Sequence, residues 1–146
     1  MYKAVDVSRF IISHEHSIEK EISNLRLQKI LYFVQAKFLT KNKKVCFVDE
    51  MQAWTFGPVV PNVYYLYKRF AAFDIRDSSP LSFILEKDKS LIKSILDMCR
   101  PYPTYQLVEI THSQDPWKNA IASGEGTVIT PDSIRTYFEK QISKNR

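Results

Sequence analysis

Apolar residues recur at helical spacing along most of the chain, and the strongest pattern lies between residues 27 and 39. Its stripe has offsets of 0, 3, 4, 7 and 11 and consists of Leu27, Ile30, Leu31, Val34 and Phe38. Four further apolar residues widen the arc beyond one face, namely Tyr32, Phe33, Ala36 and Leu39. A helix that is apolar over more than half its circumference is normally buried. The pattern therefore predicts a central helix, with Ser23-Asn24 as its N-cap pair.

Six further segments carry the apolar spacing or the start signals of helices. They are Val5–Ile18, Pro61–Phe73, Asp88–Cys99, Thr104–Thr111, a segment that begins at Asp115-Pro116 and one that begins at Thr130-Pro131-Asp132. Proline is favoured at the first helical position because its missing N–H would be unpaired there. We expect Asp6 or Ser8 to cap the first of these helices and Asp88 to cap the one that ends at Cys99.

Two short stretches rich in β-branched and aromatic residues, Val45–Val48 and Gln52–Phe56, are candidate strands. Asp49-Glu50 would form the turn between them, in solvent, and Gly57–Pro61 would follow as a rigid passage that is not helical. The fold class predicted is mainly α. Residues 1–146 would form a compact single-domain bundle of about seven helices around the central one, with at most a small β-hairpin.

Composition agrees with an ordinary globular protein, because 45% of the 146 residues are hydrophobic and 25% are charged. Neither a signal peptide nor an apolar run long enough to span a bilayer is evident, so the sequence favours a cytoplasmic protein without a membrane partner. The two cysteines, Cys46 and Cys99, stand far apart and resemble buried small hydrophobes.

The net charge of +5 comes from the N-terminal third, where residues 1–44 hold nine Lys or Arg and four Asp or Glu. Positive charge is densest at Lys37, Lys41, Lys43 and Lys44. Such a patch can attract nucleic acid or an acidic protein. The interpretation we favour is a solvated helix end, where lysines complement the helix dipole.

Motifs for catalysis or metal binding are missing from the sequence. Three glycines are too few for a nucleotide-binding glycine loop, and no GxSxG elbow occurs. His14-Glu15-His16 offers good metal ligands, but residues two apart on a helix point to nearly opposite sides. The sequence therefore predicts no enzyme, no catalytic residues, no metal site and no cofactor.

Four stretches, in order, resemble the SocA-like Panacea domain of phage-associated proteins. Residues 22–36 contain its Leu-Gln-Lys core followed by Tyr-Phe, and residues 53–64 contain a tryptophan followed by Gly-Pro-Val-x-Pro. Residues 111–120 match its Thr-His and Pro-Trp element, and residues 129–138 match its closing helix.

The resemblance implies a compact α-helical fold and a role in a toxin–antitoxin module. Family members commonly neutralise a toxin encoded beside them by direct binding, so the expected partner is a cognate toxin protein. The alternatives are a proteolytic adaptor, which would also contact a protease or unfoldase, and a nucleic-acid-binding regulator that uses the basic N-terminal third. The resemblance supplies no catalytic residues.

The candidate partner-binding residues come from these motifs and from the basic patch. They are Gln28, Lys29, Lys41, Lys43, Lys44, Trp54, Phe56, Gly57, Pro58, Pro61, Tyr64 and Trp117. Rigid aromatic side chains beside a proline-stiffened turn lose little entropy on association, which makes them effective anchors. Gln28 and Lys29 lie off the apolar stripe and would face a partner or water. The alternative is structural: the Gly-Pro turn shapes the entry to a helix, and the two tryptophans fill the core.

Overall fold

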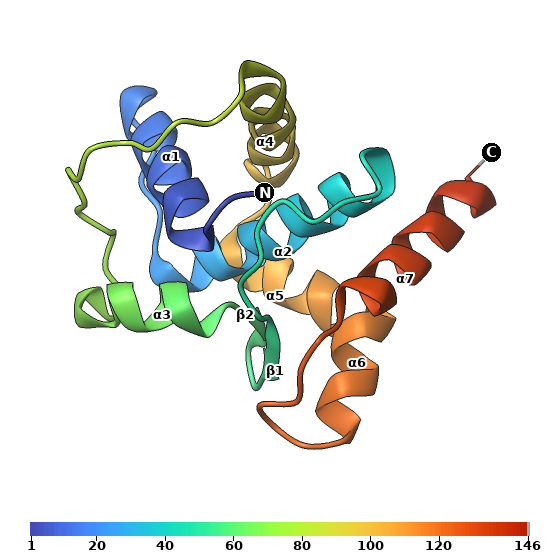
Figure 1. Cartoon of the computed structure of the whole chain (residues 1–146). Coiled ribbons are helices and arrows are strands. Elements are labelled where there is room, and N and C mark those ends of the chain that lie inside the picture. Colours follow the sequence, from blue (N-terminus) through green and yellow to red (C-terminus); the bar gives the residue numbers. More distant parts are fainter. Residues whose placement is uncertain (146) are drawn as a thin grey trace.

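The computed structural model describes residues 1–145, which fold mainly into α-helices, as predicted (Figure 1). In chain order the elements are α1 (Ala4–Ser17), α2 (Asn24–Lys41), β1 (Gln52–Trp54), β2 (Gly57–Val59), α3 (Pro61–Tyr67), the 3₁₀ helix η1 (Lys68–Phe70), α4 (Glu86–Cys99), α5 (Thr104–His112), α6 (Asp115–Ala122) and α7 (Pro131–Lys144). Within the described residues, no helix is long and apolar enough to cross a membrane.

Helix α2 is the central element, as its broad apolar arc predicts. It packs against α1, α3, α4, α5, α7 and β2, and Figure 1 shows it passing through the middle of the molecule. All nine apolar residues of the predicted arc are buried. Ser23 caps the helix as expected, because its hydroxyl accepts a hydrogen bond from the Arg26 amide at 3.2 Å. Four polar residues on α2 are buried as well, namely Asn24, Gln28, Lys29 and Gln35.

The predicted small hairpin is present, but one of its two predicted strands is wrong. β1 pairs with β2 rather than with Val45–Val48, and the antiparallel register joins Gln52 to Val59 and Trp54 to Gly57. The turn therefore lies at Thr55-Phe56, and Gly57 supplies a positive φ of 109°. The backbone amides of Cys46 and Phe47 donate to the Gln35 side-chain oxygen instead of to a strand. Gln35 on α2 thus accepts the hydrogen bonds that these two amides would otherwise donate to a neighbouring strand.

A distant segment extends the hairpin on its other side. The Ala53 amide donates to the Thr127 carbonyl at 2.8 Å, and the Ile129 amide donates to the Met51 carbonyl at 2.8 Å. An isolated antiparallel bridge joins Gln52 to Val128. Both sides of β1 are therefore occupied, by β2 and by the segment that connects α6 to α7.

The proline and threonine signals correctly locate the starts of several helices, whereas the caps predicted for α1 and α4 are wrong. Thr130 caps α7 by accepting from the Ser133 amide at 3.1 Å. α1 has no side-chain cap from Asp6 or Ser8, because its first amide, that of Ala4, donates to Asp49 at 2.8 Å. Asp88 lies inside α4 and accepts from the Tyr2 hydroxyl. A local pattern cannot identify a cap that comes from 45 residues away.

The third helix is also shorter than its apolar spacing predicts. α3 ends at Tyr67 and is followed by η1, so the regular helix does not continue to Phe73. Ala71, the C-cap residue of η1, has a φ of 50° and ψ of −126°. This backbone conformation is incompatible with a continuing right-handed helix, and it turns the chain into the irregular segment before α4.

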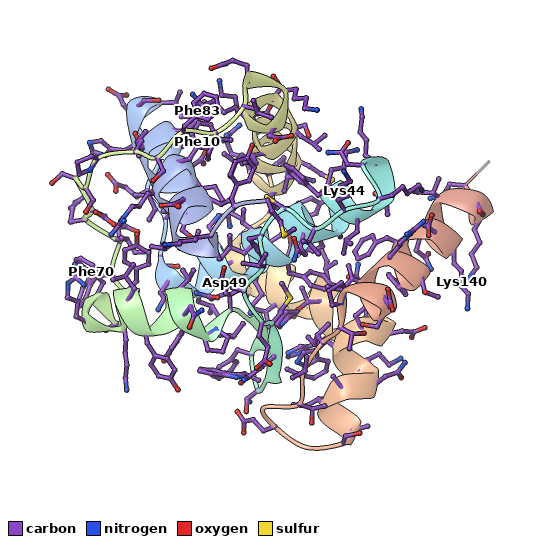
Figure 2. All side chains as sticks on the ribbon, viewed as in Figure 1. Phe10, Lys44, Asp49, Phe70, Phe83 and Lys140 are labelled. Carbon is purple, nitrogen blue, oxygen red and sulfur yellow. The ribbon has the colours of Figure 1, made fainter. Side chains whose placement is uncertain are left out.

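Replacing Asp49 with alanine should lower the free energy of unfolding by about 1–2 kcal/mol, the usual cost of losing an N-cap. One carboxylate oxygen holds the Ala4 amide, and the other accepts from the Asn62 side chain at 2.7 Å (Asp49 is labelled in Figure 2). The neighbouring Glu50→Ala is the control, because within residues 1–145 the Glu50 side chain bonds only the nearby Gln52 side chain. Urea denaturation of both variants gives the measurement, and an equal loss would contradict the capping role.

Candidate partner-binding surface

Three of the predicted aromatic anchors, Trp54, Phe56 and Tyr64, line one groove beside the hairpin. The groove has a volume of about 400 Å³ and lies between the hairpin turn and the α3–η1 segment. Trp54 and Tyr64 meet edge to face with ring centroids 4.8 Å apart, and Tyr65 packs on Tyr64 at 5.4 Å. Phe56 is 63% exposed and Tyr65 is 61% exposed. The aromatic residues predicted to flank the proline-stiffened Gly57–Pro61 passage therefore border an accessible groove.

The hairpin turn is fixed from behind by Trp117. The Trp117 indole N–H donates to the Trp54 carbonyl at 2.8 Å, and its ring stacks on His112 with centroids 4.0 Å apart. The Trp54 indole N–H donates to the Gln52 side chain at 2.9 Å. Trp117 thus supports the groove wall, partly buried, rather than standing in the groove itself.

Glu125 holds the tip of the same turn. One of its carboxylate oxygens accepts from the Thr55 amide at 3.2 Å and from the Thr55 hydroxyl at 3.0 Å. Glu125 also lines the groove, together with Leu25 and Lys68. Sequence reasoning missed these three residues as groove residues. Glu125 carries no sequence signal for this position, because 70 residues separate it from Thr55.

The expectation that Gln28 faces a partner or water is wrong, because its side chain is buried beneath the hairpin. Its side-chain oxygen accepts from the Val60 amide at 2.8 Å, and its nitrogen donates to Asn24 at 2.9 Å. Asn24 in turn donates to the Tyr64 carbonyl at 3.1 Å. Gln28 therefore positions the backbone that carries the groove, and it does so from inside the protein.

Lys29 is likewise misplaced by the sequence reasoning, since its side chain is 0% exposed. Its ammonium group donates to the Pro58 carbonyl at 2.5 Å, and burial lowers the pKa of Lys29 to about 7. Gly57 and Pro58 are buried too, so they shape the hairpin rather than present a surface. The Leu-Gln-Lys and Gly-Pro motifs, 30 residues apart, thus bind each other.

His112 completes this buried region. Burial lowers the pKa of His112, and the positive charge of Lys29 lowers it further. Within residues 1–145 its Nε2 atom is buried without a hydrogen-bond partner. The family-like Thr-His and Pro-Trp element contains this histidine, but its stacking on Trp117 is visible only in the fold.

The basic candidates lie elsewhere on the molecule. Lys41, Lys43 and Lys44 are exposed at the C-terminal end of α2, and Figure 2 labels Lys44 there. The groove touches the opposite end of the same helix, at Asn24 and Leu25. An 18-residue helix is about 27 Å long. Pro61, at the start of α3, is half-buried. The structure therefore does not bring the basic and aromatic candidates together.

A second hollow of about 380 Å³ lies between α1 and residues 75–81. Several charged groups along it are already paired. Glu21 binds Arg76 at 2.9 Å, and Asp77 accepts from the Tyr67 hydroxyl. Fewer charges remain there for a partner, so the hairpin groove is the stronger candidate surface.

The His14-Glu15-His16 segment has a structural explanation. Glu15 is buried and pairs with Arg100 at 2.7 Å, which joins α1 to the end of α4. Among residues 1–145, no three His, Cys, Asp or Glu side chains are grouped so that they could hold a metal ion.

Exposed aromatic side chains around a groove are typical of surfaces that bind other proteins. Residues 27–118 match the family described as "Antitoxin SocA-like, Panacea domain", and the chain belongs to this family. It is 31% identical over 134 residues to Antitoxin SocA of Caulobacter vibrioides (strain NA1000 / CB15N), an alignment that spans 83% of this chain and 71% of that relative. None of the solved structures matches the chain significantly.

Proposed function

We propose that this protein neutralises a toxin encoded beside it by binding that toxin directly. Its family supplies the antitoxin role, and the aromatic groove beside the hairpin supplies a surface for binding. The observation that carries the proposal is the exposure of Phe56 and Tyr65 next to the partly buried Trp54 and Tyr64. Large aromatic side chains bury roughly 150–250 Å² each when covered, so a partner that covers this cluster removes a large apolar area from water, which favours binding.

Hydrogen bonds within the chain also hold the groove on several sides. Hydrogen bonds from Trp117 and Glu125 hold its wall, and Gln28 and Lys29 hold its backbone from beneath. A preorganised surface loses less conformational entropy on binding, so more of the contact energy appears as affinity. Neutralisation of this kind needs complementary contacts and no catalytic group.

We infer that this encounter takes place in the cytoplasm. Cys46 and Cys99 are free, buried thiols, which suits a reducing compartment. Burial raises the pKa of Cys46 to about 12 and that of Cys99 to about 11, so both thiols stay protonated at neutral pH. Unreactive thiols of this type act as small core residues.

Co-expression of this chain with each immediate genomic neighbour tests the proposal. We expect one neighbour to stop growth when expressed alone, to be harmless together with this chain and to co-purify with it as a stable complex. An unrelated helical protein of similar size, expressed with the same neighbour, is the control. If no neighbour is toxic or none co-purifies, direct neutralisation is refuted.

The same experiment separates the two alternative roles. Steady levels of the toxic neighbour favour sequestration, whereas loss that requires a cellular protease favours a proteolytic adaptor. A nucleic-acid-binding regulator would instead bind DNA with an affinity that falls steeply with salt. That binding would depend on the exposed Lys41, Lys43 and Lys44, of which Lys43 is already paired with Glu139 at 2.8 Å.

A further inference from the structure

The hairpin offers little free backbone for strand addition. In β2, Pro58 has no N–H and its carbonyl accepts from Lys29, and just after the strand the Val60 amide donates to Gln28. On the other side, β1 pairs with residues 126–129. Strand addition is one of the common modes of peptide recognition, and a partner cannot use it here. The groove must recognise side chains.

The size of the groove limits what enters it. Its volume of about 400 Å³ is near the lower end of the range for small-molecule pockets, roughly 300–1,000 Å³. Its walls are the rings of Trp54, Phe56 and Tyr64, and Val59 contributes to the lining. Such a space accommodates the apolar side chains of about one helical turn, not a whole element.

Charge at the rim favours an acidic partner. Lys68 lines the groove, is exposed and makes no ion pair within the part of the chain that the structure describes. Its nearest aromatic contact is the Tyr65 ring, 5.9 Å from the ammonium nitrogen. Glu125, the acidic lining residue, already accepts two hydrogen bonds from Thr55. The chain also carries a net charge of +5, which attracts acidic surfaces.

We propose that the groove binds an amphipathic helix of the toxin, with an apolar side chain inserted against Phe56 and Trp54 and a carboxylate one turn away paired with Lys68. A helix places residues three or four apart on one face, so an anchor and an acidic neighbour reach the groove together. This inference rests on the proposed function and adds to it the chemistry of the partner surface.

The test measures the dissociation constant of the toxin identified by co-expression, using the full chain and single-site variants. We expect Phe56→Ala to weaken binding by about 30-fold or more, as for an interface hot spot. The matched control is Phe83→Ala. Phe83 is 80% exposed and lies beside α4, away from the hairpin (Figures 1 and 2). This control should leave the dissociation constant unchanged.

The charge part of the inference has its own variants. We expect Lys68→Glu to weaken binding by about tenfold, and Lys68→Gln to weaken it less while reducing the salt dependence of affinity. Lys93→Glu, an exposed charge reversal on α4, is the control. Both lysines are on the surface, so these variants should fold. Hydrogen exchange of the bound toxin should protect a helix that contains an acidic residue.

The outcomes separate the two proposals. A stable complex whose dissociation constant is unaffected by Phe56→Ala refutes the groove and leaves direct neutralisation intact. Sensitivity to Phe56→Ala without any effect of Lys68→Glu refutes the acidic helix, as does protection of a toxin strand. If no neighbour forms a complex, both the proposed function and this inference fail.

Discussion

Gly57→Ala should lower the free energy of unfolding by about 2–5 kcal/mol, the combined cost of a strained backbone and an overpacked interior. A Cβ atom at this position would lie 2.8 Å from the Thr111 hydroxyl oxygen and 3.0 Å from both Cε and Nζ of Lys29. The backbone φ of 109° is rarely adopted by residues with a side chain. Steric crowding and backbone strain therefore act together.

The neighbours of Gly57 have little freedom to move away. Thr111 is fully buried and its hydroxyl donates to the Val108 carbonyl at 2.7 Å. Lys29 is also fully buried, and its ammonium group is held by the Pro58 carbonyl. A new methyl group would have to displace one of these bonds or push the hairpin away from α2. Either change leaves a buried polar group with a poorer partner, which is costly.

Gly124→Ala is the matched control for this substitution. Gly124 has a similar φ of 119°, but apart from its own chain neighbours no atom of the described residues lies within 4 Å of the position that its Cβ would take. Gly124→Ala should therefore lower the free energy of unfolding through backbone strain alone, by about 1 kcal/mol. Urea denaturation of the two variants measures the difference, and equal losses would show that the close packing at Gly57 contributes nothing.

The free energy of unfolding should rise by about 2 kcal/mol between pH 7 and 8.5, and Lys29→Met should abolish this rise. Burial lowers the pKa of Lys29 from its ordinary value of 10.5 to about 7 in the folded protein. Between these two values the unfolded chain binds more protons than the folded one. Stability must then increase with pH, because raising the pH removes the cost of burying a charged amine.

Other titrating groups with shifted pKa values act mainly outside this window. Burial raises the pKa of Cys46 and Cys99 above their ordinary value of 9.0, so these thiols reduce stability mainly as the pH rises through about 9, with only a small loss below pH 8.5. Burial lowers the pKa of His112 below 6.5, so its effect on stability falls on the acidic side. Among these groups, Lys29 therefore makes the largest contribution to the pH dependence between pH 7 and 8.5.

Chemical denaturation at four or five pH values in this interval measures the slope of the free energy of unfolding against pH. Methionine is similar to lysine in length and has no charge, so Lys29→Met keeps the packing while it removes the titration. Lys93→Met, at an exposed position on α4, should retain the wild-type slope. A slope that persists in Lys29→Met, or that disappears in Lys93→Met, would assign the pH dependence to other groups.

Both substitutions probe one contact, in which α2 and α5 hold the hairpin between them. Lys29 comes from α2, Thr111 from α5 and Gly57 from β2. Gln28 and Lys29 thus stabilise the hairpin from inside. Phe56, which lines the groove, and the neighbouring Tyr65 are exposed on the outside.

The sequence by itself determined most of the helices, the central place of α2 and the aromatic residues beside the Gly57–Pro61 passage. These features follow from local rules. A stripe at offsets of three and four residues identifies a buried helix face, and Ser23 and Thr130 cap helices within three residues of themselves. The same kind of local information places proline at the start of α3, α6 and α7.

Only the tertiary structure decided where the polar residues of α2 point, which strands pair, and which residues share the groove. Gln28 and Lys29 fall off the apolar stripe, so their spacing alone suggests solvent; their actual partners are backbone atoms of Val60 and Pro58. Asp49 caps a helix 45 residues away, and Glu125 holds a turn 70 residues away. Such bonds depend on chain segments that meet only after folding, so neither the local spacing of apolar residues nor local propensity predicts them.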